Sequence, residues 1–265
     1  MFKGDYNFFD YKHNIAGYTG QDFGSIAQKL YLIISLVLLV ILLIGFRKAK
    51  RETVIKIIRI VSIFIIILYI VKNVWETIYD IKFTGKINWY LLPFDTCGFV
   101  MLAGILSGFC KGRIKEYADS WLVTGCIIGG IANMLFLNAF KFYPFLSFGA
   151  FYSMLWHFLM VFLGLLLVVT NHIEINIKTI LKGFIFHLIV SIFVIPINYI
   201  FGYDFMLYKD LGGVPIFENI ATKFTNMQLG FINPIMMIVL YFISFSIVVL
   251  IAMGIKKIIS KLKGL

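Results

Sequence analysis

Residues 148–170 read FGAFYSMLWHFLMVFLGLLLVVT, a run without a single Asp, Glu, Lys or Arg. A helix needs about 20 mostly apolar residues to cross the hydrocarbon core of a bilayer. The run is long enough to do so, and its one histidine, His157, would then lie inside the membrane. An uncharged apolar run of this length indicates a transmembrane helix rather than a helix of a soluble domain.

The composition of the whole chain supports the same class of protein. Of its 265 residues, 61% are hydrophobic and 14% are charged, whereas about a quarter of the residues in an ordinary soluble domain are charged. Six further segments are long and apolar enough to span a bilayer. We therefore predict an all-α, polytopic bundle of seven transmembrane helices, over residues 29–46, 59–79, 91–110, 121–139, 148–170, 181–201 and 230–254.

The basic residues predict how this bundle is oriented. The stretches on one side of the predicted membrane, 47–59, 111–115, 171–182 and 256–265, contain 15 Lys and Arg, and those on the other side contain 8. Because the side richer in Lys and Arg is normally cytoplasmic, we expect the N-terminus outside and the C-terminus in the cytoplasm of a cell-membrane protein. The net charge of +11 is then explained by helix ends, so we expect no nucleic-acid partner.

The predicted organisation has three parts. A polar segment, 1–28, precedes the helical domain, 29–254, which contains a long outer loop at 202–228 and is followed by a basic tail, 255–265. Residues 1–28 lack a basic head followed by an apolar run, so they do not resemble a cleavable signal peptide. Cys97, Cys110 and Cys126 form no CxxC pair, which argues against a disulfide framework or a zinc site. We expect no metal, no cofactor and no soluble partner.

Polar side chains within the predicted spans are candidates for a site, because they are costly in a bilayer and usually face the bundle interior. On the predicted topology they fall in the outer half of the membrane, which predicts a polar cavity open to that side. The candidate substrate-binding residues are Lys72, Asn73, Glu76, Asp95, Asn133, Asn138, Ser153 and Asn198. A simpler interpretation is that Lys72 and Glu76 neutralise each other and that the asparagines join helices.

Cys97 and His157 are the candidate nucleophile and base. With Pro93 at the first position of a helix, Cys97 would lie beside free backbone N–H groups and the positive end of the helix dipole. His157 would lie ~13 Å into its helix and Cys97 ~9 Å into its own, from the same side. Ser153, one turn before His157, would hold the ring. The alternative for Cys97 is that it is simply a small apolar side chain in the membrane core. The alternative for His157 is a structural histidine. The other three histidines, His13, His172 and His187, are not expected in the site.

Short motifs from the second helix onward resemble a known family. Leu92-Pro93-Phe94-Asp95-Thr96-Cys97 resembles the Leu-Pro-x-His-x-Cys signature of the YwaF-like bacterial membrane proteins, whose vertebrate relative is transmembrane protein 164. Further similar stretches are Asn73-Val74-Trp75, Ser153-Met154-Leu155-Trp156-His157, Pro196-Ile197-Asn198-Tyr199 and Gly202-Tyr203-Asp204-Phe205-Met206. The resemblance implies a phospholipid acyltransferase with a catalytic cysteine and histidine. Asp95 and Asp204 depart from the family pattern, which has His and Asn there.

These observations lead to a functional expectation and two rivals. The expectation is a membrane lipid acyltransferase or lipid ester hydrolase at the outer leaflet, in which Cys97 forms a thioester, His157 acts as base and membrane lipids are the substrate. The first rival is a non-enzymatic transporter or solute-binding subunit with a polar cavity open to the outside. The second is a structural membrane protein that organises partners, in which that cavity is filled or absent.

Overall fold

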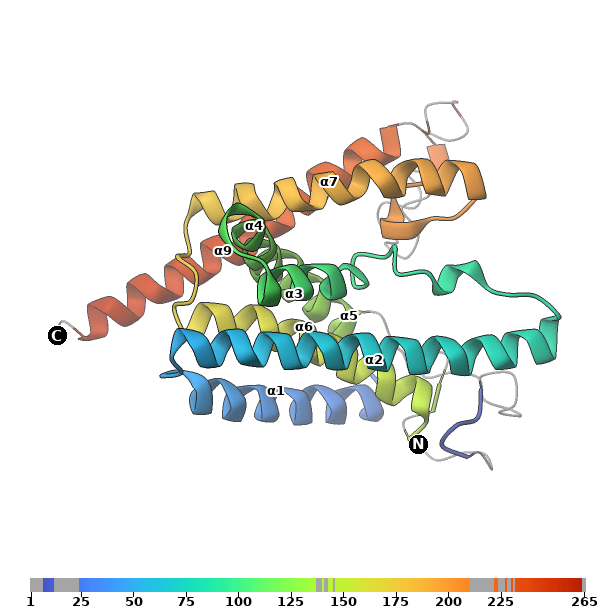
Figure 1. Ribbon diagram of the computed structural model, residues 1–265, viewed down its shortest axis with the longest axis horizontal. Coiled ribbons are helices and arrows are strands. Elements are labelled where there is room, and N and C mark those ends of the chain that lie inside the picture. Colours follow the sequence, from blue (N-terminus) through green and yellow to red (C-terminus); the bar gives the residue numbers. More distant parts are fainter. Residues whose placement is uncertain are drawn as a thin grey trace.

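The computed structural model describes residues 7–11, 24–136, 140, 143–144, 146–209, 222–223, 227, 230 and 232–263. Within these residues the protein is a helical bundle, as predicted (Figure 1). The main helices are α1 (Ile26–Phe46), α2 (Arg51–Thr84), α3 (Phe99–Phe109), α4 (Gly112–Trp121), α5 (Ile127–Leu135), α6 (Phe148–Val169), α7 (Ile177–Phe201) and α9 (Ile232–Lys263).

Successive crossings of the bundle run in alternating directions, with α4 and α5 forming one crossing (Figure 1). In the described part of the chain, six helical segments are long and apolar enough to span a membrane, and α3 is a shorter apolar helix. The start of α1 and the end of α9 consequently lie toward opposite ends of the bundle. The chain is a multi-pass membrane protein, and its orientation stays a prediction.

The third helix is shorter than predicted. Helix α3 has 11 residues and covers ~16 Å, about half of the ~30 Å hydrocarbon core. The prediction of a helix over 91–110 is therefore wrong at its start. The missing part is a short helical turn, Trp89–Leu91, followed by turns up to residue 98. This non-helical backbone lies against other helices of the bundle, where its polar groups find partners.

The fourth crossing begins nine residues earlier than predicted, at Gly112, and includes charged residues. Lys115 Nζ lies 3.0 Å from Asp119 Oδ1 on the next turn of α4, so these two buried charges neutralise each other. The Ser107 hydroxyl at the end of α3 donates a hydrogen bond to the same carboxylate. Because their charges are paired, these residues can lie within the helix rather than in a loop.

A wider turn of helix, Leu122–Cys126, joins α4 to α5. Such π turns widen the backbone locally. Two glycines on neighbouring helices accommodate it: a Cβ on Gly164 of α6 would lie 2.5 Å from the Leu122 carbonyl oxygen, and one on Gly183 of α7 would lie 2.4 Å from Thr124 Oγ1. Glycine thus permits α6 and α7 to approach the wide turn from both sides, as small residues do in membrane bundles.

The chain after α7 turns back into the bundle. We call residues 203–209 the re-entrant segment. Asn198 of α7 fixes its start, because its side chain bonds both the N–H (2.9 Å) and the carbonyl oxygen (2.7 Å) of Phe205. Phe205 and Tyr208 are fully buried. The first part of the predicted outer loop, 202–228, is therefore packed inside the protein.

Candidate functional site

Cys97 lies in a tight turn immediately before α3. We call residues 92–98 the Cys97 turn. Gly98 N–H donates to the Asp95 carbonyl oxygen (2.8 Å), and a Cβ at Gly98 would lie 2.6 Å from the Pro93 carbonyl oxygen. Only glycine fits this approach. The prediction that Pro93 begins the helix is wrong: α3 starts at Phe99 with Gly98 as its N-cap. Cys97 thus precedes the helix instead of following its first turn.

Side chains of α2 hold the start of this turn. The Leu91 carbonyl oxygen accepts hydrogen bonds from Tyr69 Oη (2.5 Å) and Asn73 Nδ2 (3.1 Å). In a continuous helix this carbonyl would bond to the N–H four residues later. The two α2 side chains replace that bond, so the chain is free to turn. Asn73, a candidate for substrate binding, contacts the backbone in this structure.

The Cys97 side chain is half-buried between helices. Its Sγ accepts a hydrogen bond from Asn133 Nδ2 of α5 at 3.2 Å, and the same amide nitrogen lies 3.1 Å from the Gly129 carbonyl oxygen. The Cys97 carbonyl oxygen accepts a bond from Trp156 Nε1 of α6 at 3.3 Å. Thus α5 contacts the sulfur and α6 contacts the backbone of the same residue.

His157 follows Trp156 on α6. Its Nδ1 lies 2.7 Å from the Ser153 carbonyl oxygen. A carbonyl oxygen only accepts, so Nδ1 carries the hydrogen and Nε2 holds the lone pair in the neutral ring. This is the tautomer of a base with Nε2 as its reactive atom. Ser153 does orient the ring, as expected, but through its backbone rather than its hydroxyl.

Helices α5 and α6 are in close contact beside His157. A Cβ on Gly130 would lie 2.9 Å from the His157 carbonyl oxygen. Asn133, which contacts Cys97 Sγ, is three residues further along α5 and so on the same side of that helix. The close approach at Gly130 therefore fixes His157 relative to the helix that contacts the cysteine.

Aromatic rings surround this region on the α2 side. Trp156 lies with its ring centroid 5.4 Å from Tyr152 and 6.1 Å from Tyr69. Lys72 Nζ lies 5.6 Å from the centroid of Tyr152 and 2.5 Å from Glu76 Oε2. Lys72 and Glu76 are thus an ion pair, as the simpler interpretation predicted. Their position next to Tyr152 places a positive group at the border of the aromatic cluster.

The remaining described candidates bond to other parts of the protein, although Asp95 also interacts electrostatically with Cys97. Asp95 Oδ1 accepts a hydrogen bond from the Met206 N–H at 3.4 Å, and Asn198 fixes the re-entrant segment as described above. Asn138 lies outside the described residues. Among the predicted residues, the structure therefore brings Asn133 into contact with Cys97 and places Lys72 and Glu76 beside the adjoining aromatic rings.

Two aromatic residues that sequence reasoning missed connect this region to the re-entrant segment. Tyr241 Oη of α9 lies 2.6 Å from Thr96 Oγ1, next to Cys97, and donates to the Met206 carbonyl oxygen at 3.3 Å. Tyr208 Oη lies 3.0 Å from Nε2 of His187, whose ring packs 4.1 Å from that of Tyr241. The aromatic and apolar run YDFMLY at 203–208 was the available signal, since it is unusual for an exposed loop.

The described residues contain no candidate metal-binding cluster. None of them form a group of three or more His, Cys, Asp or Glu side chains placed to hold an ion. The three cysteines are free thiols. The groups that contact Cys97 or act on it are the Asn133 amide, the Trp156 indole and the carboxyl group of Asp95.

Comparison with known proteins gives a family match. The model of the TMEM164 family matches residues 23–257, which is nearly the whole chain. Neither a curated protein nor a solved structure matches the chain. The family match confirms the resemblance to transmembrane protein 164 that the short motifs indicated.

Proposed function

Because this chain belongs to the TMEM164 family, we propose that it is a membrane-embedded lipid acyltransferase or lipid ester hydrolase. Cys97 is the nucleophile and His157 the base, and the substrate is a lipid ester of the outer leaflet of the cell membrane. One observation carries the proposal: His157 Nδ1 is bonded to the Ser153 carbonyl oxygen, while the neighbouring Trp156 bonds the Cys97 backbone. These contacts support the proposal, because they leave His157 Nε2 free to accept a proton and join the neighbouring residue of α6 to the turn that carries the thiol.

The first half of the reaction forms a thioester. Charged groups are costly in an apolar site, so a neutral thiol and a neutral imidazole form the resting pair. As Sγ attacks the ester carbonyl carbon, its proton moves to His157 Nε2. The carbonyl oxygen becomes an oxyanion. When the intermediate collapses, the C–O bond to the lysolipid breaks and His157 returns the proton to the leaving oxygen.

The second half transfers the acyl group. A lysolipid hydroxyl, or water, attacks the thioester carbon and gives its proton to His157 Nε2. The C–S bond then breaks, and the thiolate takes this proton back. The acceptor decides between transferase and hydrolase, so exclusion of water from the site is what favours acyl transfer.

Asn133 supplies a donor for the oxyanion. Its Nδ2 lies 3.2 Å from Cys97 Sγ, the atom to which the attacked carbon becomes bonded. Amide side chains serve this role in other acyl transfer sites. Asn133 is held in turn by the Gly129 carbonyl oxygen of its own helix. The donor is thus oriented before the substrate arrives, which is the condition for electrostatic catalysis.

Acyl exchange measured on reconstituted protein tests the proposal. The full chain is purified, placed in liposomes with a labelled phospholipid donor and a lysophospholipid acceptor, and assayed by mass spectrometry. We expect Cys97→Ser and His157→Ala to lower the rate by about a thousandfold or more, as loss of a nucleophile or its base does in other enzymes. Cys110→Ser is the matched control and should retain activity. Full activity in both site variants would sink the proposal.

A solute-binding protein is the rival function, and it has less support. Asn73 and Asn198, which were expected to line its polar cavity, bond backbone groups of the protein instead. A lipid-tailed thiol-reactive probe discriminates the two functions. Selective labelling of Cys97 supports the enzyme, whereas thermal stabilisation by a solute without such labelling supports the rival.

A further inference from the structure

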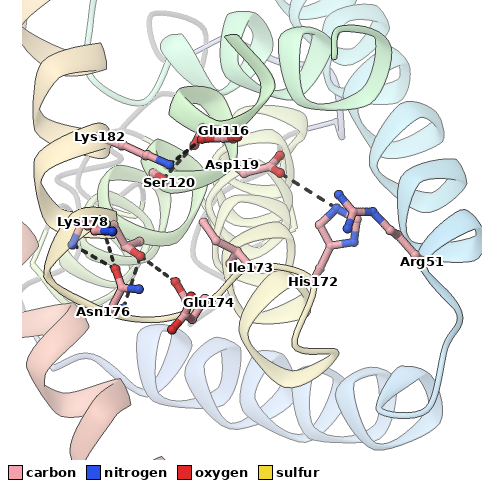
Figure 2. A pocket seen from close by; sticks show the side chains of 11 residues that line it. Arg51, Glu116, Asp119, Ser120, His172, Ile173, Glu174, Asn176, Lys178 and Lys182 are labelled. Carbon is pink, nitrogen blue, oxygen red and sulfur yellow. Dashed lines mark hydrogen bonds and ion pairs between the residues drawn. The ribbon is translucent and has the colours of Figure 1, made fainter. Parts of the chain in front are cut away.

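A polar cleft lies where α2 and α7 begin and beside α4, which follows the end of α3 remote from the Cys97 turn. Figure 2 shows the side chains that line it. Its volume is about 350 Å³, at the lower end of the range for ligand pockets. The start of α2, one face of α4, the turn between α6 and α7, and the first turn of α7 line it. Its lining residues are Arg51, Glu116, Asp119, Ser120, His172, Ile173, Glu174, Asn176, Lys178, Thr179 and Lys182.

Two of the three carboxylates of this cleft are paired with lysines, and the third, Glu174, has no ion pair among the described residues. Glu116 Oε2 lies 2.5 Å from Lys182 Nζ, and Asp119 is paired with Lys115. Glu174 interacts electrostatically with Lys256. The negative side chains therefore do not make the cleft a cation site.

Two cations of the lining are free of such partners. Among the described residues, neither Arg51 nor Lys178 has an acidic group within ion-pair distance. Figure 2 shows the Arg51 side chain extending from the start of α2 toward the His172 ring. With Glu174 as the one carboxylate without an ion pair in the lining, the unpaired charge of the cleft is positive on balance, and its two cations come from two different helices.

His172 is the second, independent feature of the cleft. Its side chain is 1% exposed, and within the described part of the chain neither ring nitrogen has a hydrogen-bond partner. The nearest acidic atom, Asp119 Oδ2, is 3.9 Å from Nε2, too far for a hydrogen bond. A buried polar group without a partner costs free energy, so a ligand that bonds the ring would recover it.

The surroundings of His172 favour the neutral form of its ring. Burial lowers its pKa, and the positive charges of Lys115 and Arg51 add to this effect against the opposing charge of Asp119. A neutral imidazole presents one N–H donor and one acceptor. It therefore suits a ligand oxygen that accepts a hydrogen bond, as the oxygen atoms of a phosphate group do.

The start of α7 also favours a negatively charged ligand in the cleft. Asn176 caps the helix and accepts hydrogen bonds from the N–H groups of Lys178 and Thr179. The first turn of a 25-residue helix carries the positive end of its dipole, which favours a negative group nearby.

We infer that this cleft is a binding site for a phosphate group, held by Arg51 and His172, while Lys178 at the other end of the cleft adds to its positive potential. The phosphate belongs either to a lipid headgroup of the adjacent leaflet, which is the cytoplasmic one on the predicted topology, or to a small soluble phosphate ester. The site is separate from the Cys97 turn and does not depend on catalysis there.

Binding to the purified full-length protein in phosphatidylcholine nanodiscs tests the inference. In the soluble arm, glycerol 3-phosphate and inorganic phosphate are titrated by calorimetry and by thermal shift. In the lipid arm, phosphatidic acid is added to the nanodiscs and its retention on the released protein is measured by native mass spectrometry. Cys97→Ser protein is run in parallel and should bind as the wild type does.

Charge-removing variants give the expected outcome. Arg51→Gln is an exposed change and should weaken binding about tenfold, the size expected for one charge-assisted contact. His172→Phe, which keeps the buried ring without its nitrogens, should weaken it similarly. Lys178→Gln, also exposed, removes a more distant charge and should weaken binding by a smaller factor. Lys48→Gln, an exposed basic residue outside the cleft lining, is the matched control and should bind normally.

Each arm identifies one source of the phosphate. Saturable binding of the soluble esters assigns the site to a metabolite, and retention of phosphatidic acid alone assigns it to a lipid. Wild-type protein that binds in neither arm would overturn the inference, as would an Arg51→Gln variant that binds with wild-type affinity.

Discussion

At the scale of single residues, the candidate site depends on hydrogen bonds between side chains and backbone groups. Ser153 orients His157 through its carbonyl oxygen, and Trp156 holds the Cys97 carbonyl. The sequence predicted the pair Cys97 and His157 as candidates but not these contacts, because a backbone acceptor leaves no mark on residue identity. It did predict the Lys72–Glu76 ion pair, since a spacing of four places both on one helical face.

Asn133 is the residue whose substitution separates catalysis from thiol reactivity. We expect Asn133→Ala to lower the rate of acyl exchange by about a hundredfold, because an oxyanion donor is lost. Labelling of Cys97 by a small thiol-reactive probe should persist, since probe alkylation forms no oxyanion. Rates come from the liposome assay and labelling from intact-protein mass spectrometry. Wild-type exchange by Asn133→Ala would contradict the assigned role.

At the scale of helices, apolar length was predictable and the interruptions were not. Runs such as α6 carry their own signal, since hydropathy alone defines them. The turn before α3 depends on Tyr69 and Asn73, which are distant in sequence, and the charged start of α4 depends on Ser107 from the preceding helix. These are tertiary contacts, which outweigh local preference when helix boundaries are set.

The wide turn between α4 and α5 makes a specific prediction about glycine. Gly164→Ala would place a Cβ 2.5 Å from the Leu122 carbonyl oxygen, a backbone atom that cannot move aside. We expect it to destabilise the protein by roughly 1–3 kcal/mol, the usual effect of overpacking. Tm in detergent measures this effect.

Gly254 provides the matched control for that substitution. It lies within α9 and has no heavy atom within 4 Å of its hypothetical Cβ. Alanine favours a helix over glycine by about 0.5–1 kcal/mol, so Gly254→Ala should leave Tm unchanged or raise it. If Gly164→Ala behaved like Gly254→Ala, the close packing of α6 on the wide turn would be refuted.

At the scale of the whole molecule, the distribution of Lys and Arg predicts which end faces the cytoplasm. The phosphate cleft lies at the end richer in basic residues, among them Arg51 and Lys178, and the Cys97 turn lies toward the other. The fold fixes the relation between these two ends, whereas the membrane decides which compartment each one meets. The orientation of the bundle in the membrane therefore determines which leaflet each proposed site faces.

Reporter fusions measure this orientation in cells. We expect a fluorescent protein joined to the C-terminus to fluoresce, because it folds in the cytoplasm, and alkaline phosphatase at the same point to be inactive. Phosphatase joined after Thr84, at the opposite end of α2, should be active. The reverse pattern would place the Cys97 turn on the cytoplasmic side of the membrane.

The re-entrant segment also has a consequence for how the protein is made. Its Met206 and Lys209 carbonyl oxygens accept bonds from Tyr241 and Asn233, both on α9. A chain that has emerged only as far as α7 has no partners for these groups, and unpaired carbonyls are not tolerated in lipid. Insertion of the last helix must therefore precede docking of the segment. The surroundings of Cys97 are therefore completed last, and we expect a nascent chain that stalls before α9 to lack the contact between Tyr241 and Thr96 beside Cys97.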